Sequence, residues 1–138
     1  MDWIIPILAV VVFATFFLLK RMSFVPEETA REHLANGALI IDVRSPEEFR
    51  QGKVPGAINL PLGEVREKIS QRVKDKNQPL LVHCLSGGRS AIAAHQLKSL
   101  GYTQVFNLGS LNRAQRLCAA APNKKSTPQG APRNQTET

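Results

Sequence analysis

The sequence predicts an α/β protein in which a parallel sheet is flanked by helices on both faces and preceded by one transmembrane helix. Two observations lead to this prediction. Short apolar runs rich in β-branched residues alternate with segments of helical character, and this alternation is typical of parallel sheets covered on both faces. Ahead of them, residues 3–19 form an apolar run without a charged residue.

The apolar run has the composition of a membrane span. As a helix, its 17 positions would cover roughly 25 Å, just enough to cross a thin hydrocarbon core. Met1-Asp2, which precede it, lack the Lys or Arg of a secretory signal, and a buried core helix is rarely apolar on every face. Lys20-Arg21 follow the run directly. By the positive-inside rule, we expect a single-pass membrane protein whose remaining chain lies on the cytoplasmic side.

Beyond residue 22, strand-like and helix-like segments alternate. The strand-like segments are short and apolar, and they lie at 39–43, 57–60, 79–83 and 103–108. The helix-like segments begin with capping residues or carry apolar residues at helical spacing, and they lie at 26–35, 46–51, 63–73, 88–100 and 111–121. In parallel sheets the ligand site lies beyond the carboxyl ends of the strands, and Cys84 directly follows the third strand.

The helix expected to begin at residue 46 has a clear start signal. Ser45 stands at the cap, Pro46 at the first helical position and Glu48 three residues after the cap. Gly52 keeps this helix short. Glu48 is placed to pair with Arg44, four residues before it.

The net charge of +7 is unevenly distributed along the chain. Residues 23–111 carry 11 basic and 9 acidic residues, whereas residues 112–138 carry 5 basic residues and 1 acidic residue. Because a nucleic-acid-binding protein concentrates basic charge on its folded domain, we expect no nucleic-acid partner. The polar segment from Pro122 lacks an apolar stripe, which predicts a disordered basic tail over 122–138 and a folded domain over 23–121. The tail suits an anionic membrane surface or plain solvent.

The segment from Cys84 to Arg89 carries the strongest chemical signal. A Cys in a turn between a strand and a helix faces inward-pointing N–H groups, which favour thiolate over thiol. An unperturbed thiol is only about 3% ionised at pH 7, and lowering its pKa by about two units makes roughly three-quarters of it thiolate. Gly87 and Gly88 would allow positive φ and leave room for a bound anion, and Arg89 offers a rigid fork for an oxygen-rich substrate. A buried Cys followed by an ordinary glycine turn is the alternative.

Three segments together resemble the rhodanese family. They are residues 41–49 (IDVRSPEEF), residues 52–61 (GKVPGAINLP) and residues 84–89 (CLSGGR), in the family's order and at similar spacing. The resemblance extends over about residues 40–108 and implies a rhodanese-like fold. Lys53 stands where the family has His, and Leu85 stands where a basic residue is frequent.

This resemblance implies an enzyme of the thiosulfate:cyanide sulfurtransferase type that uses no cofactor. The Cys84 thiolate would take the outer sulfur of a small donor such as thiosulfate and release sulfite. The Cys84 persulfide would then pass this sulfur to cyanide, to a small thiol or to a protein thiol. The loop residues Leu85, Ser86, Gly87 and Gly88 would stabilise both anions through their N–H groups, and Arg89 would hold the oxyanion end of the donor.

Other residues near the loop are expected to be structural. The resemblance places Asp42 and Arg44 at the end of a strand, where charged groups commonly satisfy buried polar atoms. His83 precedes Cys84 on a strand, so its side chain points to the opposite face and is expected in the core. No set of metal ligands is expected. Cys118 is expected to be a small core residue, with a second sulfur-relay thiol as the alternative.

Two other functions fit parts of the pattern. Cysteine phosphatases also have a Cys, a glycine-rich loop and an Arg, but they need five residues between Cys and Arg, and only four separate Cys84 from Arg89. A non-catalytic rhodanese-like binding or sulfur-carrier module at the membrane is the second alternative. The presence of Cys84, both glycines and Arg89 argues against it.

Overall fold

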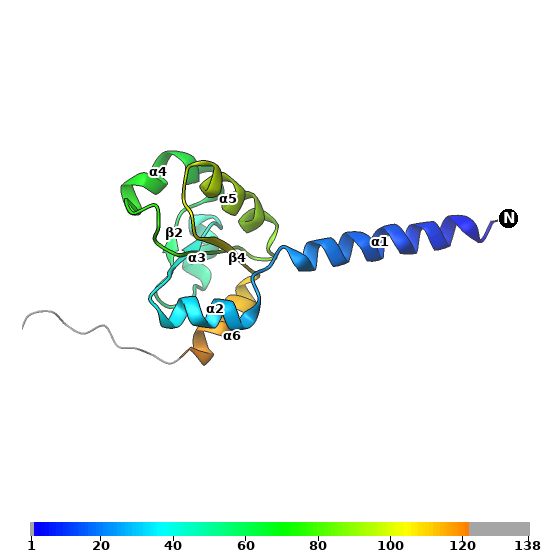
Figure 1. The fold of residues 1–138 in the computed structure, drawn as a ribbon, viewed down its shortest axis with the longest axis horizontal. Coiled ribbons are helices and arrows are strands. Elements are labelled where there is room, and N and C mark those ends of the chain that lie inside the picture. Colours follow the sequence, from blue (N-terminus) through cyan, green and yellow to red (C-terminus); the bar gives the residue numbers. More distant parts are fainter. Residues whose placement is uncertain (1, 122–138) are drawn as a thin grey trace, which may run out of the picture.

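The computed structural model describes residues 2–121, apart from the side chains of residues 20–22 (Figure 1). Its helices are α1 (Ile4–Met22), α2 (Glu27–Ala35), α3 (Pro46–Gln51), the 3-10 helix η1 (Leu62–Glu64), α4 (Val65–Arg72), α5 (Gly88–Ser99) and α6 (Leu111–Ala120). Its strands are β1 (Leu39–Asp42), β2 (Ile58–Asn59), β3 (Leu80–His83) and β4 (Val105–Gly109).

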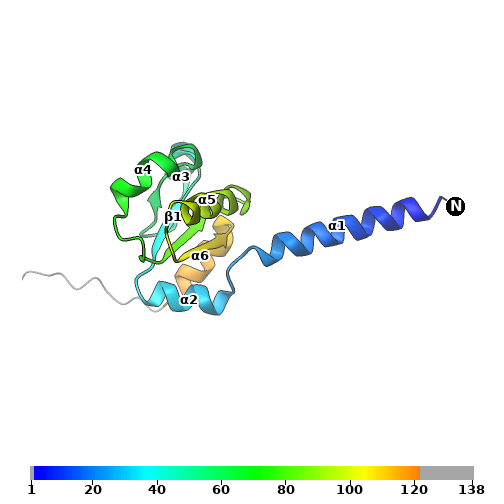
Figure 2. The ribbon, with the colours of Figure 1, turned by 45° about the horizontal axis from the view of Figure 1, so that its top comes forward.

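The strands form one parallel sheet in the order β2-β1-β3-β4. Helices α4 and α5 cover one face, and α2 and α6 cover the other (Figures 1 and 2). Neighbouring strand residues supply the two faces because side chains alternate along a strand. Ile41 and Val82 are paired in register and pack toward α4 and α5, whereas Ile40 and Leu81 pack toward α2 and α6. The predicted α/β architecture is confirmed.

All four strands lie within the ranges expected from the sequence, give or take one residue. Ser45 accepts a hydrogen bond from the N–H of Glu48, whose carboxylate accepts one from the N–H of Ser45, so the capping box at α3 is formed. One element differs in shape. The helix expected over 63–73 is divided into η1 and α4, and its first turn is wound as a 3-10 helix after Pro61.

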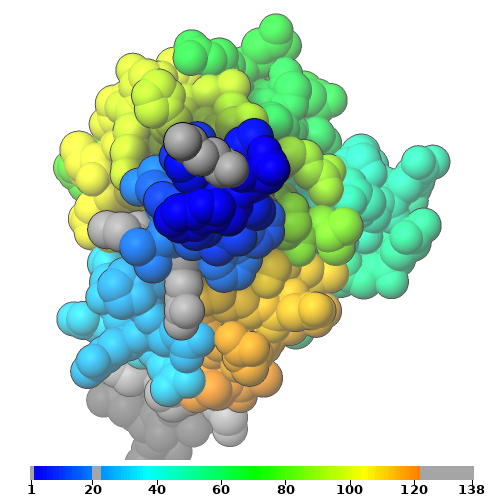
Figure 3. Space-filling model, turned by 90° about the vertical axis from the view of Figure 1, so that its right-hand side faces the viewer, coloured from blue at the N-terminus to red at the C-terminus, as the bar shows by residue number. Residues whose placement is uncertain are grey.

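Helix α1 projects from the domain (Figure 1), and Figure 3 views the molecule from that side, with α1 in blue in front of the domain. In the part of the chain that the structure describes, no helix is sufficiently long and apolar to span a membrane. The expectation of a transmembrane helix over 3–19 is therefore corrected. The uncharged part of α1, residues 4–19, covers about 24 Å at about 1.5 Å per residue, less than the roughly 30 Å of a typical hydrocarbon core. The predicted disordered tail, residues 122–138, lies outside the described residues.

Tyr102 closes the core between α5 and β4. Its side chain is 2% exposed, and its hydroxyl donates to the carbonyl of Val73 at 2.6 Å. This hydrogen bond joins Tyr102, just after α5, to Val73, the residue that follows α4. Removing the hydroxyl would leave a buried carbonyl without this donor.

We expect Tyr102→Phe to lower the free energy of unfolding by about 1–2 kcal/mol, since one buried hydrogen bond is lost. Urea denaturation followed by circular dichroism measures this change. Ser99→Ala is the matched control, because it removes an exposed hydroxyl at the end of the same helix. Equal midpoints for Tyr102→Phe and the unchanged protein would contradict this role.

Candidate active site

Cys84 lies immediately after β3 and before the turn that starts α5. Its N–H donates to the carbonyl of Gly109 at 3.1 Å, so the loop begins tied to the end of β4. A further bridge joins Ser86 to Ser110. Cys84 is 1% exposed. The candidate nucleophile thus lies at the carboxyl ends of the neighbouring strands β3 and β4, where parallel sheets place their ligands.

Hydrogen-bond donors surround the Cys84 sulfur. The N–H of Gly87 donates to Sγ at 3.0 Å. Burial by itself raises the pKa of the Cys84 thiol. The N–H and hydroxyl of Ser90 and the N–H groups of Gly87 and Ser86 more than offset this, so the pKa is lowered overall. The loop therefore favours thiolate at a position that is nearly closed to solvent.

Ser90 and Asn107 hold this loop in shape, and neither residue was expected at the site from the sequence. The Ser90 hydroxyl lies 2.7 Å from Oδ1 of Asn107 and 3.1 Å from the carbonyl of Gly87. Asn107 also donates from Nδ2 to the Gly87 carbonyl at 3.4 Å and accepts from the N–H of Gly109 at 3.0 Å. The available signal was a polar Asn inside an otherwise apolar strand, facing a Ser in the first turn of a helix.

Only one of the two loop glycines is required by its surroundings. Gly87 has φ +100°, and a Cβ on it would lie 2.5 Å from the ring of Phe24. Gly88 lacks a positive φ, and a Cβ there would meet nothing within 4 Å. The positive φ expected for Gly88 is therefore wrong, and this glycine is the first residue of α5. The ring of Phe24 also lies against Gly109, so a residue just before α2 packs against the catalytic loop.

Arg89 pairs with Glu48 across the site. Its Nη1 and Nη2 each donate to one carboxylate oxygen at 2.8 Å, in a bidentate arrangement. The hydrogen bonds from Arg89 are the main cause that lowers the pKa of Glu48 to about 2, and Glu48 in turn raises the pKa of Arg89. The expected pairing of Glu48 with Arg44 is wrong. The reason is that the Arg44 guanidinium is engaged elsewhere.

Arg44 and Asp42 form a buried ion pair at the end of β1. Arg44 Nη2 lies 2.6 Å from Asp42 Oδ2, and Nε lies 3.0 Å from both carboxylate oxygens. The remaining Arg44 donors bind the carbonyls of Glu48 and Gly52, at 3.2 and 2.6 Å. The pair thereby ties the end of β1 to α3 and to the residue that follows this helix, which agrees with a structural role.

His83 is completely buried. Its Nε2 lies 3.7 Å from Asp42 Oδ2, and burial is the main cause that lowers its pKa. A neutral imidazole in the core fits the expected structural role. His83 Nδ1 faces the carbonyl of Cys84 at 3.3 Å, which is a backbone contact and not a contact with the sulfur.

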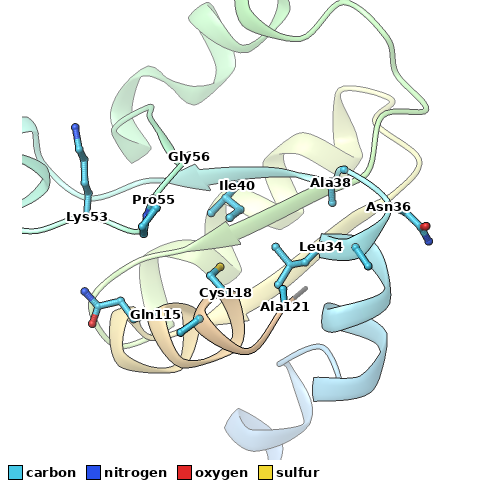
Figure 4. A pocket seen from close by; sticks show the side chains of 13 residues that line it. Leu34, Asn36, Ala38, Ile40, Lys53, Pro55, Gly56, Gln115, Cys118 and Ala121 are labelled. Carbon is cyan, nitrogen blue, oxygen red and sulfur yellow. The ribbon is translucent and has the colours of Figure 1, made fainter. Parts of the chain in front are cut away.

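Beside the loop, a recess of about 250 Å³ is lined by Arg44, Glu48, Gln51, Gly52, Leu85 and Leu111. Leu85, the residue after Cys84, is 55% exposed. A larger hollow of about 940 Å³ lies between α2, α6 and the loop before β2 (Figure 4). It contains Lys53, Cys118 and Ala38, which precedes β1. This hollow therefore opens at the amino ends of the strands, away from Cys84.

Comparison with known proteins decides the family. Residues 26–115 match the rhodanese-like domain family. The chain belongs to this family. A thiosulfate sulfurtransferase of Escherichia coli K12, PspE, is 49% identical over 71 residues, which cover 51% of this chain and 68% of the relative. A sulfurtransferase of Allochromatium vinosum is 34% identical over 86 residues, which cover 61% of this chain and 78% of the relative.

Solved structures agree with this rhodanese assignment. A structure described as rhodanese with anions, from E. coli, shares 45% identity and a TM-score of 0.54, covering 56% of this chain and 91% of its own. The human single-domain sulfurtransferase TSTD1 shares 29% identity and a TM-score of 0.58, covering 75% and 98%. The chain is a rhodanese-type sulfurtransferase. Phe24 lies just outside the matched range, so its contact with the loop is a feature of this chain beyond the family match.

The two cysteines of this rhodanese differ in a way that alkylation can measure. Burial raises the pKa of Cys118, whereas the loop lowers that of Cys84. We expect iodoacetamide to modify Cys84 first at pH 7, although Cys84 is more buried than Cys118. The pH of half-maximal rate should lie below the ordinary thiol pKa of about 8.5 for Cys84 and above it for Cys118. Peptide mass spectrometry gives both rates.

Ser90→Ala removes one donor and should move the Cys84 profile to higher pH without moving that of Cys118. If Cys118 reacts first at pH 7, exposure decides reactivity and the loop does not stabilise the thiolate.

Proposed function

We propose that Cys84 carries sulfur between a sulfane donor and a thiophilic acceptor. The observation that carries this proposal is the buried sulfur that accepts a hydrogen bond from the N–H of Gly87. In the first step, Cys84 thiolate attacks the outer sulfur of a donor such as thiosulfate. The new bond joins Sγ to that sulfur, the donor S–S bond breaks, and its electron pair leaves with sulfite. The product is the Cys84 persulfide anion.

The second step returns the enzyme to its starting state. An acceptor such as cyanide, a small thiol or a protein thiol attacks the outer sulfur of the persulfide. With cyanide, the Sγ–S bond breaks, thiocyanate leaves and Cys84 thiolate is restored. The N–H groups of Ser86 and Gly87, which already lower the thiol pKa, are placed to stabilise both sulfur anions. We propose residues 23–121 as the functional unit.

The loop supports sulfur transfer better than phosphate chemistry. A phosphoryl group brings three equatorial oxygens that the loop amides and the Arg must surround. Only four residues separate Cys84 from Arg89, and each terminal nitrogen of Arg89 already donates one hydrogen bond to Glu48. A single added sulfur needs little space above the thiolate.

Cys84→Ser should abolish both persulfide formation and thiocyanate production, because a serine hydroxyl cannot be ionised at neutral pH. Mass spectrometry of the intact protein after incubation with thiosulfate should show one added sulfur on the unchanged chain only. Cys118→Ser is the matched control and should keep both properties. The proposal fails if Cys84→Ser keeps its turnover, or if the unchanged protein hydrolyses aryl phosphates faster than it transfers sulfur.

The location of the domain is a separate proposal. We propose that it acts on the cytoplasmic side of a membrane, with α1 lying in the lipid interface and not crossing it. Large apolar side chains of α1, among them Phe13, Phe16 and Leu19, are more than 60% exposed. An exposed apolar helix followed by Lys20-Arg21 suits an anionic leaflet, and two free cysteines suit a reducing compartment.

Flotation with lipid vesicles tests this location. The full chain should float with vesicles that contain phosphatidylserine, and a chain beginning at Ser23 should stay at the bottom of the gradient. In cells, a reporter fused to the C-terminus should be active in the cytoplasm alone. Failure of the full chain to float, or an external reporter signal, would contradict the proposal.

A further inference from the structure

The ring of Phe24 packs against two glycines that bind the backbone or the sulfur of Cys84. A Cβ placed on Gly87 would lie 2.5 Å from Cε1 and 2.6 Å from Cζ of this ring. A Cβ placed on Gly109 would lie 3.4 Å from Cγ and from Cδ2 of the same ring. The far end of the ring therefore faces Gly87, and the end next to the Cβ of Phe24 faces Gly109.

Both glycines hold Cys84 by hydrogen bonds, and both have a positive φ. The N–H of Gly87 donates to Sγ at 3.0 Å, and the carbonyl of Gly109 accepts from the N–H of Cys84 at 3.1 Å. Their φ angles are +100° and +96°. Because glycine adopts positive and negative φ about equally readily, neither residue keeps this conformation by itself. The surrounding contacts have to keep it.

Hydrogen bonds restrain only one side of Gly87. Ser90 and Asn107 bind its carbonyl, which belongs to the following peptide group. On the Cα side, the nearest atoms outside the adjoining residues are the two ring atoms of Phe24, followed by the Cα of Gly109 at 3.5 Å. The ring thus fills the space beside the Gly87 Cα, which cannot move in that direction without a clash.

The ring itself is held by the segment around it. The N–H of Val25 donates to the carbonyl of Asn107 at 2.9 Å, which fastens the residue after Phe24 to β4. The guanidinium carbon of Arg113 lies over the ring, 5.8 Å from its centre. Arg113 also donates to the carbonyls of Val25 and Leu108. Phe24 is therefore a fixed support for the loop.

We propose that Phe24 is a positioning residue of the site: its ring holds Gly87 and Gly109 in the backbone conformation that directs the Gly87 N–H at the Cys84 sulfur. Phe24 acts through these two glycines and not on the sulfur. The inference rests on the sulfur transfer proposed above, because it concerns the thiolate that begins each cycle. Residues 26–115 match the family, and Phe24 precedes them, so the match assigns this residue no role.

The consequence of losing this support falls on the ionisation of Cys84. Burial raises the pKa of this thiol, and the N–H groups of Gly87 and Ser86 are among the donors that outweigh burial. A hydrogen bond to the charged form favours that form only while its geometry is kept. A Gly87 that can move weakens its hydrogen bond to Sγ, so the balance shifts toward the neutral thiol.

Phe24→Leu removes the contact selectively. A leucine keeps the Cγ and two Cδ atoms that face Gly109, but it lacks the Cε1 and Cζ atoms that face Gly87. Phe106→Leu is the matched control. It makes the same change in a partly buried ring that packs on the α2 side of the sheet and stacks on His33 at 4.4 Å. Phe24→Met is a second variant, whose flexible side chain is long enough to reach Gly87.

The test measures alkylation of the full chain by iodoacetamide as a function of pH, with Cys118 as the internal reference. We expect Phe24→Leu to raise the pH of half-maximal rate at Cys84 by about one unit, the expected effect of weakening one hydrogen bond to an anion. Phe24→Met should keep most of the original profile, and Phe106→Leu should leave it unchanged. Circular dichroism shows whether each variant is folded.

Sulfur transfer from thiosulfate to cyanide gives a second measurement. The kcat/KM of Phe24→Leu, divided by that of the unchanged protein at the same pH, should be several-fold below one at pH 7. This ratio should recover as the pH rises, because the thiolate forms again. A loss of structure alone would lower the ratio equally at every pH.

The outcomes separate this inference from the proposed function. A folded Phe24→Leu with the original Cys84 profile overturns the positioning role. An equal shift in Phe106→Leu or in Phe24→Met also overturns it, since the contact with Gly87 would then not be the cause. If the Cys84 profile shifts as expected but the unchanged protein transfers no sulfur, the positioning role stands and the proposed function fails.

Discussion

The Cys84 sulfur has to be stabilised as an anion at a place that water hardly reaches, and the geometry around it follows from that requirement. Burial opposes ionisation, so the backbone must supply donors, and it can do so only if Gly87 turns its N–H toward Sγ. That turn needs φ +100°, which excludes a side chain at residue 87. Asn107 and Ser90 then hold the carbonyl of Gly87, which belongs to the following peptide group. One strand residue and one helix residue thus fix the backbone immediately after the N–H that serves the sulfur.

Two ion pairs near the loop have different physical characters. The pair of Asp42 and Arg44 is nearly inaccessible, and its remaining donors are satisfied by carbonyls, so breaking it would leave a buried charge. The pair of Arg89 and Glu48 is partly open to solvent, which reduces its contribution to stability. A partly exposed pair can open for a ligand at modest cost. The first pair therefore shapes the site, and the second can respond to what enters it.

The elements of the fold could be predicted because their signals are local. Alternation of short apolar runs with capped helices identified the sheet, and the Ser45 capping box formed as expected. Contacts between distant segments could not be read in this way. Glu48 had a neighbour at helical spacing, yet its partner is Arg89, 41 residues away, because Arg44 is held by Asp42. Composition also led to the wrong prediction of a transmembrane helix over residues 3–19, because the absence of charge alone does not make a helix long and apolar enough to span a membrane.

The contact between Phe24 and the loop also escaped prediction, and it bears on how α1 is joined to the domain. The ring of Phe24 lies against Gly87 and Gly109, and the N–H of Val25 donates to the carbonyl of Asn107 at 2.9 Å. Arg113 clamps the same segment, because it donates to the carbonyls of Val25 and Leu108. The chain that leaves α1 is therefore fastened to β4 and α6 within a few residues, and not through a loose linker. Phe24, in this segment, packs against Gly87, whose N–H donates to the Cys84 sulfur. The attachment of α1 and the shape of the catalytic loop therefore depend on the same packing contact.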